Sequence, residues 1–445
     1  MVIIDGIRPA ATEEKGETTM KIIKDERALR RFTSILKKRA EGVNDETVDA
    51  VSEILQGIKD RGDRALMEYT ERFDGLKVPP FEIPAKEISG LSRLTPPGTV
   101  RALKTAARRI LEFHKKQVEE SWTFRDRGAV MGQIIRPIER IGVYVPGGKA
   151  SYPSTVLMNV IPAQVAGVKE IALCVPTPHG DINPALMTAI EILGVKEVYR
   201  IGGAQAVGAL AYGTETIRKV DKIVGPGNIY VATAKRMVFG LVDIDMIAGP
   251  SEVLIIADRL ARPELIAADL LGQAEHDELA SSILITTSAD LAERVNSELK
   301  EQLKGLRRKG IASSSLRNFG RIIIVKSLKQ ALGIANDIAP EHLEIMTEDP
   351  EKLLPLVRNA GAIFLGEWTP EPLGDYAAGP NHTLPTGGTA RFFSPLGVYD
   401  FLKRSSLIKF SRRSFLRLAP VVETLSDTEG LEAHGNTIRI RRGPG

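Results

Sequence analysis

The segment Ile141-Gly-Val-Tyr-Val-Pro-Gly-Gly148 decides the fold, because it joins a β-rich run to a glycine turn. Ile141–Val145 is typical of a buried strand, and a helical stretch follows at 154–166. Further strands are expected at 170–175, 197–201 and 222–224, and then in a second series at 253–257, 282–286, 321–325 and 362–365. Helical stretches separate most of these strands, and this alternation predicts βαβ units and parallel sheets.

Two successive series predict an α/β protein with two doubly wound parallel-sheet domains and small helical elements at both ends. The helices between 30 and 120 are expected to pack on the second series of strands. Together these two parts form the domain that begins first in the sequence, so this first domain is discontinuous. The expected divisions are an N-terminal arm at 1–20, a first domain at 21–135 and 250–380, a second at 136–249, and a small C-terminal domain at 381–445. We also expect a helix at 350–359 and a surface position for His114.

Composition indicates an ordinary globular protein and excludes several classes. The 445 residues carry 60 basic and 56 acidic side chains, a balance that gives no support for a nucleic-acid partner. Eighteen consecutive apolar residues occur nowhere, so no membrane span is expected. The single cysteine, Cys174, excludes internal disulfides and favours a reducing, cytoplasmic location. Because Cys174 lies in an expected strand, we interpret it as a core residue.

Glycine-rich turns follow three strands of the first series. They are Tyr144-Val-Pro-Gly-Gly-Lys149, Ile201-Gly-Gly-Ala-Gln205 and Val224-Gly-Pro-Gly-Asn228. The first is not a phosphate loop, since Val143 stands where that motif needs glycine and Ala150 where it needs Ser or Thr. Any one of these segments could be an ordinary turn with no role in ligand binding. Three at equivalent strand ends favour a nucleotide crevice, with Gln205 and Asn228 offering amide groups.

The stretch Asp269-Leu-Leu-Gly-Gln-Ala-Glu-His276 offers a candidate metal site. Gln273 and His276 are three residues apart on an expected helix, so they share one face and could converge on one ion. An amide oxygen and a neutral imidazole suit zinc, although glutamine is an uncommon ligand. A solvated helix face is the ordinary alternative for such a pair.

Other polar motifs could supply acid–base chemistry. Ala339-Pro-Glu-His-Leu343 places Glu341 beside His342, and in a cleft such a pair can share general-base work, although adjacent Glu-His pairs also arise by chance. The remaining candidates are Asp375 as a hard ligand, Glu429 and His434 as a carboxylate and an imidazole five residues apart, and Ser251, which on spacing alone is more typical of a turn.

Taken together, these motifs resemble the histidinol dehydrogenase family. The shared motifs are Tyr-Val-Pro-Gly-Gly, Gly-Gly-Ala-Gln-Ala, Gly-Pro-Gly-Asn, Ala-Gly-Pro-Ser-Glu, Gln-Ala-Glu-His, Pro-Glu-His-Leu, Gly-Pro-Asn-His-Thr-Leu-Pro-Thr and Glu-Gly-Leu-x-Ala-His, in order from Tyr144 to His434. The resemblance implies two incomplete Rossmann-like domains. It also implies oxidation of L-histidinol to L-histidine, the last step of histidine biosynthesis, with two NAD molecules and a bound aldehyde.

The resemblance also implies a role for each motif residue. Zinc would be held by Gln273, His276, Asp375 and His434, with His434 coming from the partner subunit of a homodimer with shared active sites. Glu341 and His342 would be catalytic, and Tyr144, Gln205 and Asn228 would contact NAD. The substrate site would be lined by Ser251, Gln273, His276, His342, Asp375, Glu429 and His434.

Two alternatives remain open. One is a related zinc- and NAD-dependent dehydrogenase that acts on another small polar alcohol, such as a sulfonated diol; Glu429 argues against a sulfonate, which a carboxylate repels. The other is a non-enzymatic metal- or nucleotide-binding protein on the same scaffold. The presence of both Glu341 and His342 beside the expected ligand set argues against it.

Overall fold

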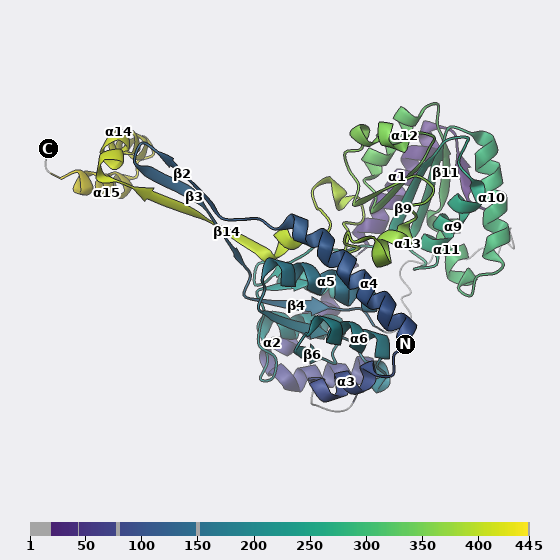
Figure 1. The fold of residues 1–445 in the computed structure, drawn as a ribbon, viewed down its shortest axis with the longest axis horizontal. Helices are drawn as coiled ribbons and strands as arrows, with labels where there is room; N and C mark the ends of the chain where they lie inside the picture. The colour runs from purple at the N-terminus through teal and green to yellow at the C-terminus, as the bar shows by residue number, and fades with distance from the viewer. Residues whose placement is uncertain (1–18, 43, 77–80, 148–151, 444–445) are drawn as a thin grey trace.

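The computed structural model describes residues 19–42, 44–76, 81–147 and 152–443 (Figure 1). Residues 1–18 of the expected N-terminal arm and Gly148 of the first glycine turn lie outside the described residues. The described chain forms two parallel sheets and a third, antiparallel one. The α/β class predicted from the sequence is therefore confirmed.

Sheet A has six parallel strands in the order β1-β11-β10-β9-β12-β13. They are β1 Lys21–Ile23, β9 Glu252–Ala257, β10 Ser281–Thr286, β11 Arg321–Ile324, β12 His342–Met346 and β13 Ala362–Leu365. One face is covered by α9 Pro263–Ala274, α10 Ala289–Leu303 and α11 Lys309–Phe319, and the other by α1 Glu26–Glu41 and α12 Leu328–Ile338. Strands β9, β10 and β12 are buried throughout, as is typical of central strands of a parallel sheet, and Val253–Ala257 of β9 is apolar without a break.

Sheet B has five parallel strands in the order β6-β5-β4-β7-β8. They are β4 Arg140–Tyr144, β5 Glu170–Cys174, β6 Glu197–Tyr199, β7 Lys222–Val224 and β8 Asp243–Ile244. Its helices are α5 Pro153–Ala166, α6 Pro184–Leu193, α7 Gly203–Tyr212 and α8 Ile229–Val238. Cys174 is fully buried in β5, as expected from the sequence.

The N-terminal helices divide between the two sheets. Phe32 and Leu36 of α1 join the core of sheet A, but the longer helices α2, α3 and α4 pack on sheet B. These helices are α2 Asp45–Asp74, α3 Ala85–Ser92 and α4 Pro97–His114. The expectation that all helices of 30–120 pack on the second series is therefore wrong for α2 to α4. The apolar stripe of α2, which includes Val51 and Ile58, meets the nearly all-apolar α7 instead.

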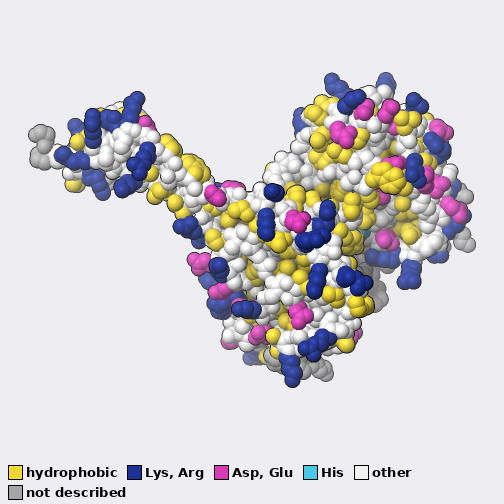
Figure 2. Space-filling view, in the orientation of Figure 1, with side chains coloured by type: hydrophobic (Ala, Val, Ile, Leu, Met, Phe, Trp, Pro, Cys, Tyr) yellow, Lys and Arg dark blue, Asp and Glu magenta, His cyan; other side chains and the backbone are white. Residues whose placement is uncertain are grey.

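A third sheet forms an arm that the sequence did not predict. β2 Trp122–Asp126, β3 Ala129–Pro137 and β14 Leu402–Phe410 pair antiparallel in the order β14-β3-β2, and they carry α14 Arg412–Thr428 and α15 Glu432–Arg442 at the far end (Figure 1). Residues 122–135 therefore belong to the arm and not to the first domain. Figure 2 shows the arm standing clear of the body, with Lys and Arg side chains gathered at its end.

Two local predictions were wrong. The stretch 350–359 forms only the 3-10 turns Pro350–Lys352 and Leu354–Leu356, because Pro355 cannot donate a helical hydrogen bond. His114 is fully buried, because α4 packs on sheet B and turns its last residue inward. Among the described helices, none is long and apolar enough to cross a membrane.

Candidate active site

The strand order of sheet A creates the site of interest. β9 is followed by β10 and β11 on one side, and β12 and β13 lie on its other side, so the order reverses between β9 and β12. Glu252 opens β9 and His342 opens β12, where His342 pairs with Val253. Polar residues therefore meet at the amino ends of these two strands. In open α/β sheets ligands usually bind at the carboxyl ends, so this edge departs from the general rule.

His342 has one ring nitrogen engaged and one available. Its Nδ1 lies 3.1 Å from the backbone oxygen of Glu252, which makes Nδ1 the N–H donor of the neutral ring. Its Nε2 has no hydrogen-bond partner among the described residues and lies 3.6 Å from Oδ1 of Asp375. Burial lowers the pKa of His342, but the carboxylates of Glu371, Glu341 and Asp375 outweigh it and raise that pKa well above its ordinary value. These carboxylates therefore favour the imidazolium form, and Nε2 becomes available as a base when a cation beside it offsets their charge.

Glu341 lies beside His342 as a second base. One of its carboxylate oxygens accepts a hydrogen bond of 2.9 Å from the backbone N–H of Glu252 and lies 3.8 Å from His342 Nδ1. Burial raises the pKa of Glu341 to about 8, because the side chain is only 5% exposed. Near neutral pH, Glu341 can therefore exchange a proton. Ser251 precedes Glu252, and its backbone oxygen accepts the N–H of Ser281 at the same edge.

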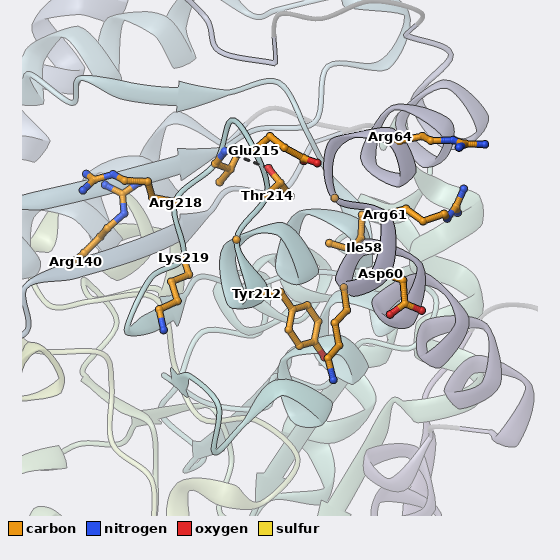
Figure 3. Close-up of a pocket in the computed structure, with 14 residues that line it drawn as sticks. Ile58, Asp60, Arg61, Arg64, Arg140, Tyr212, Thr214, Glu215, Arg218 and Lys219 are labelled. Atoms are coloured by element: carbon orange, nitrogen blue, oxygen red, sulfur yellow. Dashed lines mark hydrogen bonds between the residues drawn. The ribbon is translucent and has the colours of Figure 1, made fainter.

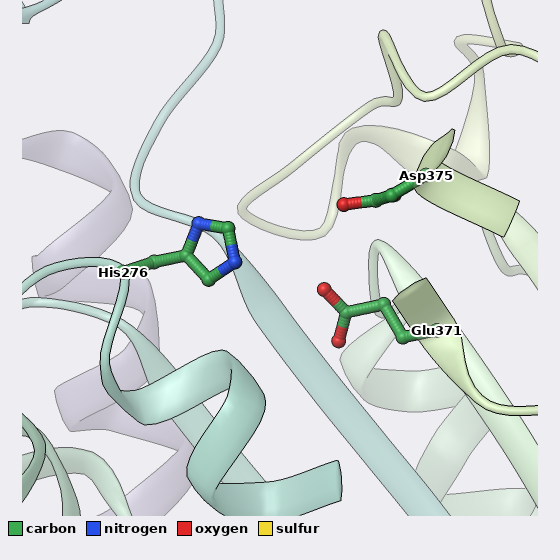
Figure 4. Close-up of side chains that lie close together, drawn as sticks. All are labelled: His276, Glu371 and Asp375. Carbon is green, nitrogen blue, oxygen red and sulfur yellow. The ribbon is translucent and has the colours of Figure 1, made fainter. Parts of the chain in front are cut away.

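A candidate metal centre lies next to these bases. His276, Glu371 and Asp375 each offer a ligand atom, and these atoms lie within 4.8 Å of one another (Figure 4). Gln273 lies in the last turn of α9 and His276 just after it, and the backbone N–H of His276 donates to the backbone oxygen of Gln273 at 3.2 Å. The Gln273 side chain is fully buried, yet neither atom of its amide has a hydrogen-bond partner among the described residues. An orphaned amide beside an imidazole and carboxylates fits a divalent ion.

Glu371 was not a candidate in the sequence analysis. It begins the short helix α13, Glu371–Leu373, and its backbone N–H donates to Glu344 of β12 at 2.8 Å. Burial raises the pKa of Glu371 to about 7 and also raises that of Glu344. The Glu-Pro dipeptide at 371–372 belongs to no motif, so only the fold reveals its proximity to Asp375. Asp375 itself lies in the following turn, Gly374–Ala378.

Tyr144, Gln205 and Asn228 meet at the carboxyl edge of sheet B, on both sides of its own reversal point between β4 and β7. The backbone N–H of Gly203 donates to the Tyr144 hydroxyl at 3.2 Å. Asn228 caps α8 by accepting the N–H groups of residues 230 and 231, which leaves its amide N–H groups for a ligand. Gly225 has a φ of 113°, and a Cβ there would lie 2.0 Å from the Tyr144 backbone oxygen. The turn therefore lies directly against the end of β4.

His382 links the site at the amino edge of sheet A to the carboxyl edge of sheet B. The Nδ1 of His382 lies 3.0 Å from the backbone oxygen of Asp375, and its Nε2 lies 3.3 Å from the Thr155 hydroxyl. Thr155 is in the first turn of α5, which follows the glycine turn after β4. The ligand-bearing turn of sheet A is thus anchored to the crevice side of sheet B.

Glu429 directly follows α14 and His434 lies in α15, and both are exposed; within one chain the arm holds these helices away from α9 and α13 (Figure 1). The structure therefore brings together His276, Glu341, His342 and Asp375, with Ser251 at the same edge and Gln273 three residues before His276. It does not bring Glu429 and His434 to them within a single chain.

A separate pocket lies at the opposite, amino edge of sheet B (Figure 3). Its volume is about 1070 Å³, and Arg140, Arg218 and Lys219 contribute to its lining. Arg140 pairs with Glu170 and Glu197, and Arg218 also pairs with Glu170. The charges of Arg140 and Arg218 are therefore offset by Glu170 and Glu197, so the pocket offers less charge than its lining indicates.

Comparison with known proteins gives a consistent result. The family model described as histidinol dehydrogenase matches residues 37–442. The chain is 57% identical to the histidinol dehydrogenase of Syntrophotalea carbinolica over 88% of this chain and 92% of that protein. It is 54% identical to that of Aquifex aeolicus, over 94% and 98%. A crystal structure of histidinol dehydrogenase from Elizabethkingia anophelis superposes with a TM-score of 0.90 at 38% identity, covering 95% and 98% of the two chains.

Proposed function

Because the chain belongs to the histidinol dehydrogenase family, we propose that it oxidises L-histidinol to L-histidine in two NAD-dependent steps, through an aldehyde that stays bound. The observation that carries this proposal is the placement of the free Nε2 of His342 and the Glu341 carboxylate beside the His276 and Asp375 cluster. Two bases next to a candidate ion site suit an alcohol oxidation followed by an aldehyde oxidation.

The ion of the proposed function is zinc, held by Gln273, His276 and Asp375 of one subunit and His434 of a second copy. It would bind the imidazole and amine of the substrate and offset the negative charge of the carboxylates around His342. The side chains present fit such an ion, since the buried amide of Gln273 is otherwise unpaired among the described residues.

In the first step, Nε2 of His342 accepts the proton of the substrate hydroxyl. The hydrogen bond from Nδ1 to the Glu252 backbone fixes the ring so that Nε2 faces the site. The Glu371, Glu341 and Asp375 carboxylates stabilise the imidazolium that results. Hydride leaves the same carbon for the nicotinamide of NAD, and the product is the aldehyde.

In the second step, Glu341 takes a proton from water, and the resulting hydroxide adds to the aldehyde carbon to give a geminal diol with one ionised oxygen. The N–H of Glu252 holds the Glu341 carboxylate in place at 2.9 Å. A second NAD bound at the carboxyl edge of sheet B would take hydride from this carbon, and the ionised oxygen would become the carbonyl oxygen of L-histidine. General-base catalysis of this kind typically contributes about 10²–10⁴-fold to a step.

The carboxyl edge of sheet B is the proposed NAD site. Gly225 and Gly203 allow a close approach of backbone to a dinucleotide, and Asn228 presents amide N–H groups at the start of α8. Tyr144 and Gln205 complete this edge. His382 spans from this edge to Asp375, which supports a cofactor and an ion in one shared cleft.

The arm is the proposed means of sharing sites in a homodimer. It exposes apolar side chains that a free monomer would leave in water, including Trp122 at 52% and Ile408 at 71% exposure. Docking of the arm on a second copy would cover them and carry Glu429 and His434 to that copy's site.

The single buried cysteine fits a cytoplasmic enzyme of histidine biosynthesis.

A related dehydrogenase acting on another small polar alcohol is the alternative. Purified protein with L-histidinol and NAD distinguishes the two: about two NADH per histidinol are expected from a two-step oxidation. A yield of one NADH per histidinol would contradict the aldehyde-oxidation step and the role proposed for Glu341 in it. No reduction with histidinol, but reduction with another alcohol, would reject the proposed substrate.

A further inference from the structure

Lys235 and Asp245 form a buried ion pair next to the glycine turn that follows β7. Their side chains are 3% and 1% exposed, and the Lys235 ammonium donates to Oδ1 of Asp245. Lys235 lies in α8, whose other buried residues are mostly apolar, and Asp245 directly follows β8. A buried ion pair stabilises a core no better than well-packed apolar side chains often do, so the burial of these two charges requires another explanation.

The pair binds both backbone polar groups of Gly225, the first residue of the turn. The N–H of Gly225 donates to Oδ2 of Asp245 at 2.7 Å, and the Lys235 ammonium donates to the Gly225 oxygen at 2.9 Å. The Asp245 carboxylate is itself held by the backbone N–H of Met246 at 2.7 Å. Because the N–H and the oxygen belong to the two planar peptide units on either side of Gly225, the pair fixes both torsion angles of this residue.

Gly225 needs this support because of its conformation and its place. Its φ of 113° is one that other residues rarely adopt, and glycine loses more conformational freedom on folding than any other residue. The turn leads to Asn228, whose side-chain oxygen caps α8 and whose amide N–H groups remain for a ligand. The position of Asn228 therefore depends on how firmly Gly225 is held.

The ammonium of Lys235 does not serve as a direct contact for a cofactor phosphate. Its charge is matched by Asp245, and its hydrogen bonds go to that carboxylate and to Gly225. Lys235 and Asp245 therefore act on a bound dinucleotide through the turn.

We propose that Lys235 and Asp245 are positioning residues for NAD, which hold the Gly225 turn in its binding conformation before the dinucleotide arrives. This inference rests on the NAD site of the proposed function, and it assigns a role to two residues outside the shared motifs. A turn that is already fixed binds its ligand without a further loss of conformational entropy.

A second Lys–Asp pair between the same two strands provides a matched control. Lys222 of β7 pairs with Asp243 of β8, and their Nζ and Oδ2 atoms lie 2.9 Å apart. These residues begin their strands, so they lie at the amino edge of sheet B, opposite to the glycine turn.

The test is the dissociation constant of NAD, measured by calorimetric titration of the full-length protein without histidinol. Wild type is compared with Lys235→Met/Asp245→Asn and with Lys222→Met/Asp243→Asn, which nearly keep side-chain volume and leave no unpaired charge. Lys235→Met and Asp245→Asn are also measured singly, and thermal unfolding checks that each variant is folded. Steady-state kinetics gives kcat and the KM values for NAD and for histidinol.

We expect Lys235→Met/Asp245→Asn to raise the dissociation constant and the KM of NAD by about 10-fold or more. The kcat at saturating NAD and the KM of histidinol should stay near their wild-type values. Lys222→Met/Asp243→Asn should match wild type throughout. Asp245→Asn alone should also weaken NAD binding, and it decides the question if the double variant does not fold.

Unchanged NAD binding by the variants of Lys235 and Asp245 would overturn the proposal. Equal losses from both pairs would also overturn it, since they would assign the effect to general destabilisation. Weaker binding by Lys235→Met with unchanged or tighter binding by Asp245→Asn would make Lys235 a direct phosphate contact and contradict a positioning role. Absence of NAD binding by wild type would instead reject the proposed NAD site, and the role of the pair with it.

Discussion

His342 Nε2 lies 3.6 Å from Asp375 Oδ1, so a candidate base and a candidate metal ligand share one contact. The two residues come from different parts of sheet A: β12 begins at His342, and Asp375 follows β13. Any change in the charge of Asp375 therefore acts directly on the proton affinity of His342. This contact links ion binding to base strength.

Replacing Glu341 by Gln should separate the two proposed steps. The amide cannot accept a proton from water, so oxidation of the aldehyde should slow by about 10²–10⁴-fold while oxidation of the alcohol slows less. Single-turnover measurements with histidinol and with the aldehyde give the two rates. Equal losses in both steps would contradict a water-activating role.

The aldehyde step should depend on pH through Glu341. Burial raises the pKa of this carboxyl to about 8, and only its ionised form can act as a base, so the rate should rise as pH increases through that value. Ion binding nearby would lower the midpoint but keep the direction. A pH profile of the aldehyde step in wild type and in Glu341→Gln tests this, because the variant should lack the rising limb.

His114 should make stability depend on pH. Nδ1 of the buried ring lies 2.8 Å from the Ile110 oxygen, and burial lowers the pKa of His114 below its ordinary value of 6.5. As the pH falls, the unfolded chain therefore binds a proton at this histidine at a higher pH than the folded protein does. The free energy of unfolding should have its full value above pH 6.5 and should decrease as the pH falls below 6.5. The slope approaches about 1.4 kcal/mol per pH unit for one proton.

Denaturant titrations at several pH values test the role of His114. His114→Gln should lose part of the wild-type slope, whereas His179→Gln should keep it, since the His179 side chain is exposed. A wild-type slope in His114→Gln would place the titration elsewhere.

Gly225→Ala should weaken NAD binding. The new Cβ would meet the Tyr144 backbone at 2.0 Å and force the turn away from β4, so a rise of about 10-fold or more in the NAD dissociation constant is expected. Gly240 is a matched control, because its φ of 99° is also positive but nothing lies within 4 Å of the added Cβ. Equal effects of both substitutions on NAD would assign the loss to backbone strain.

Mixing His434→Ala and Glu341→Gln subunits should restore activity if sites are shared. One site of each mixed dimer then has both native residues, and random pairing would give about a quarter of wild-type activity. The measurement is turnover after the inactive variants are unfolded and refolded together. If activity stays absent although mixed dimers form, His434 serves the site of its own subunit.

The two parallel sheets could be predicted because their strands are local runs with clear periodicity. Ala362–Leu365, for example, has the predicted bounds. The antiparallel sheet of the arm could not be predicted, because β3 pairs with β14 across more than 260 residues, and β2 and β14 have no buried residues that would give an alternating apolar pattern. The sheet on which α2 packs could not be predicted either, because an apolar stripe on a helix does not indicate which element it contacts.

The candidate site was only partly accessible from sequence for a similar reason. Short-range spacing identified Gln273 with His276 and Glu341 with His342. Glu371 was missed because its proximity to Asp375 depends on the chain direction after β13 and on the bond from its backbone to Glu344. The carboxyl-edge rule agrees with the positions of the residues proposed to contact NAD but points away from the two proposed bases, which lie at the amino ends of strands.

The arm also constrains the order in which the chain can be completed during synthesis. Residues 45–244 contain all of sheet B with most of its helices, so this unit can form while the rest of the chain is still on the ribosome. The hairpin of β2 and β3 must wait for β14, and β1 remains without its neighbour until β11 at Arg321–Ile324 has emerged. The chain from Arg321 onward therefore completes both the β1 edge of sheet A and the arm.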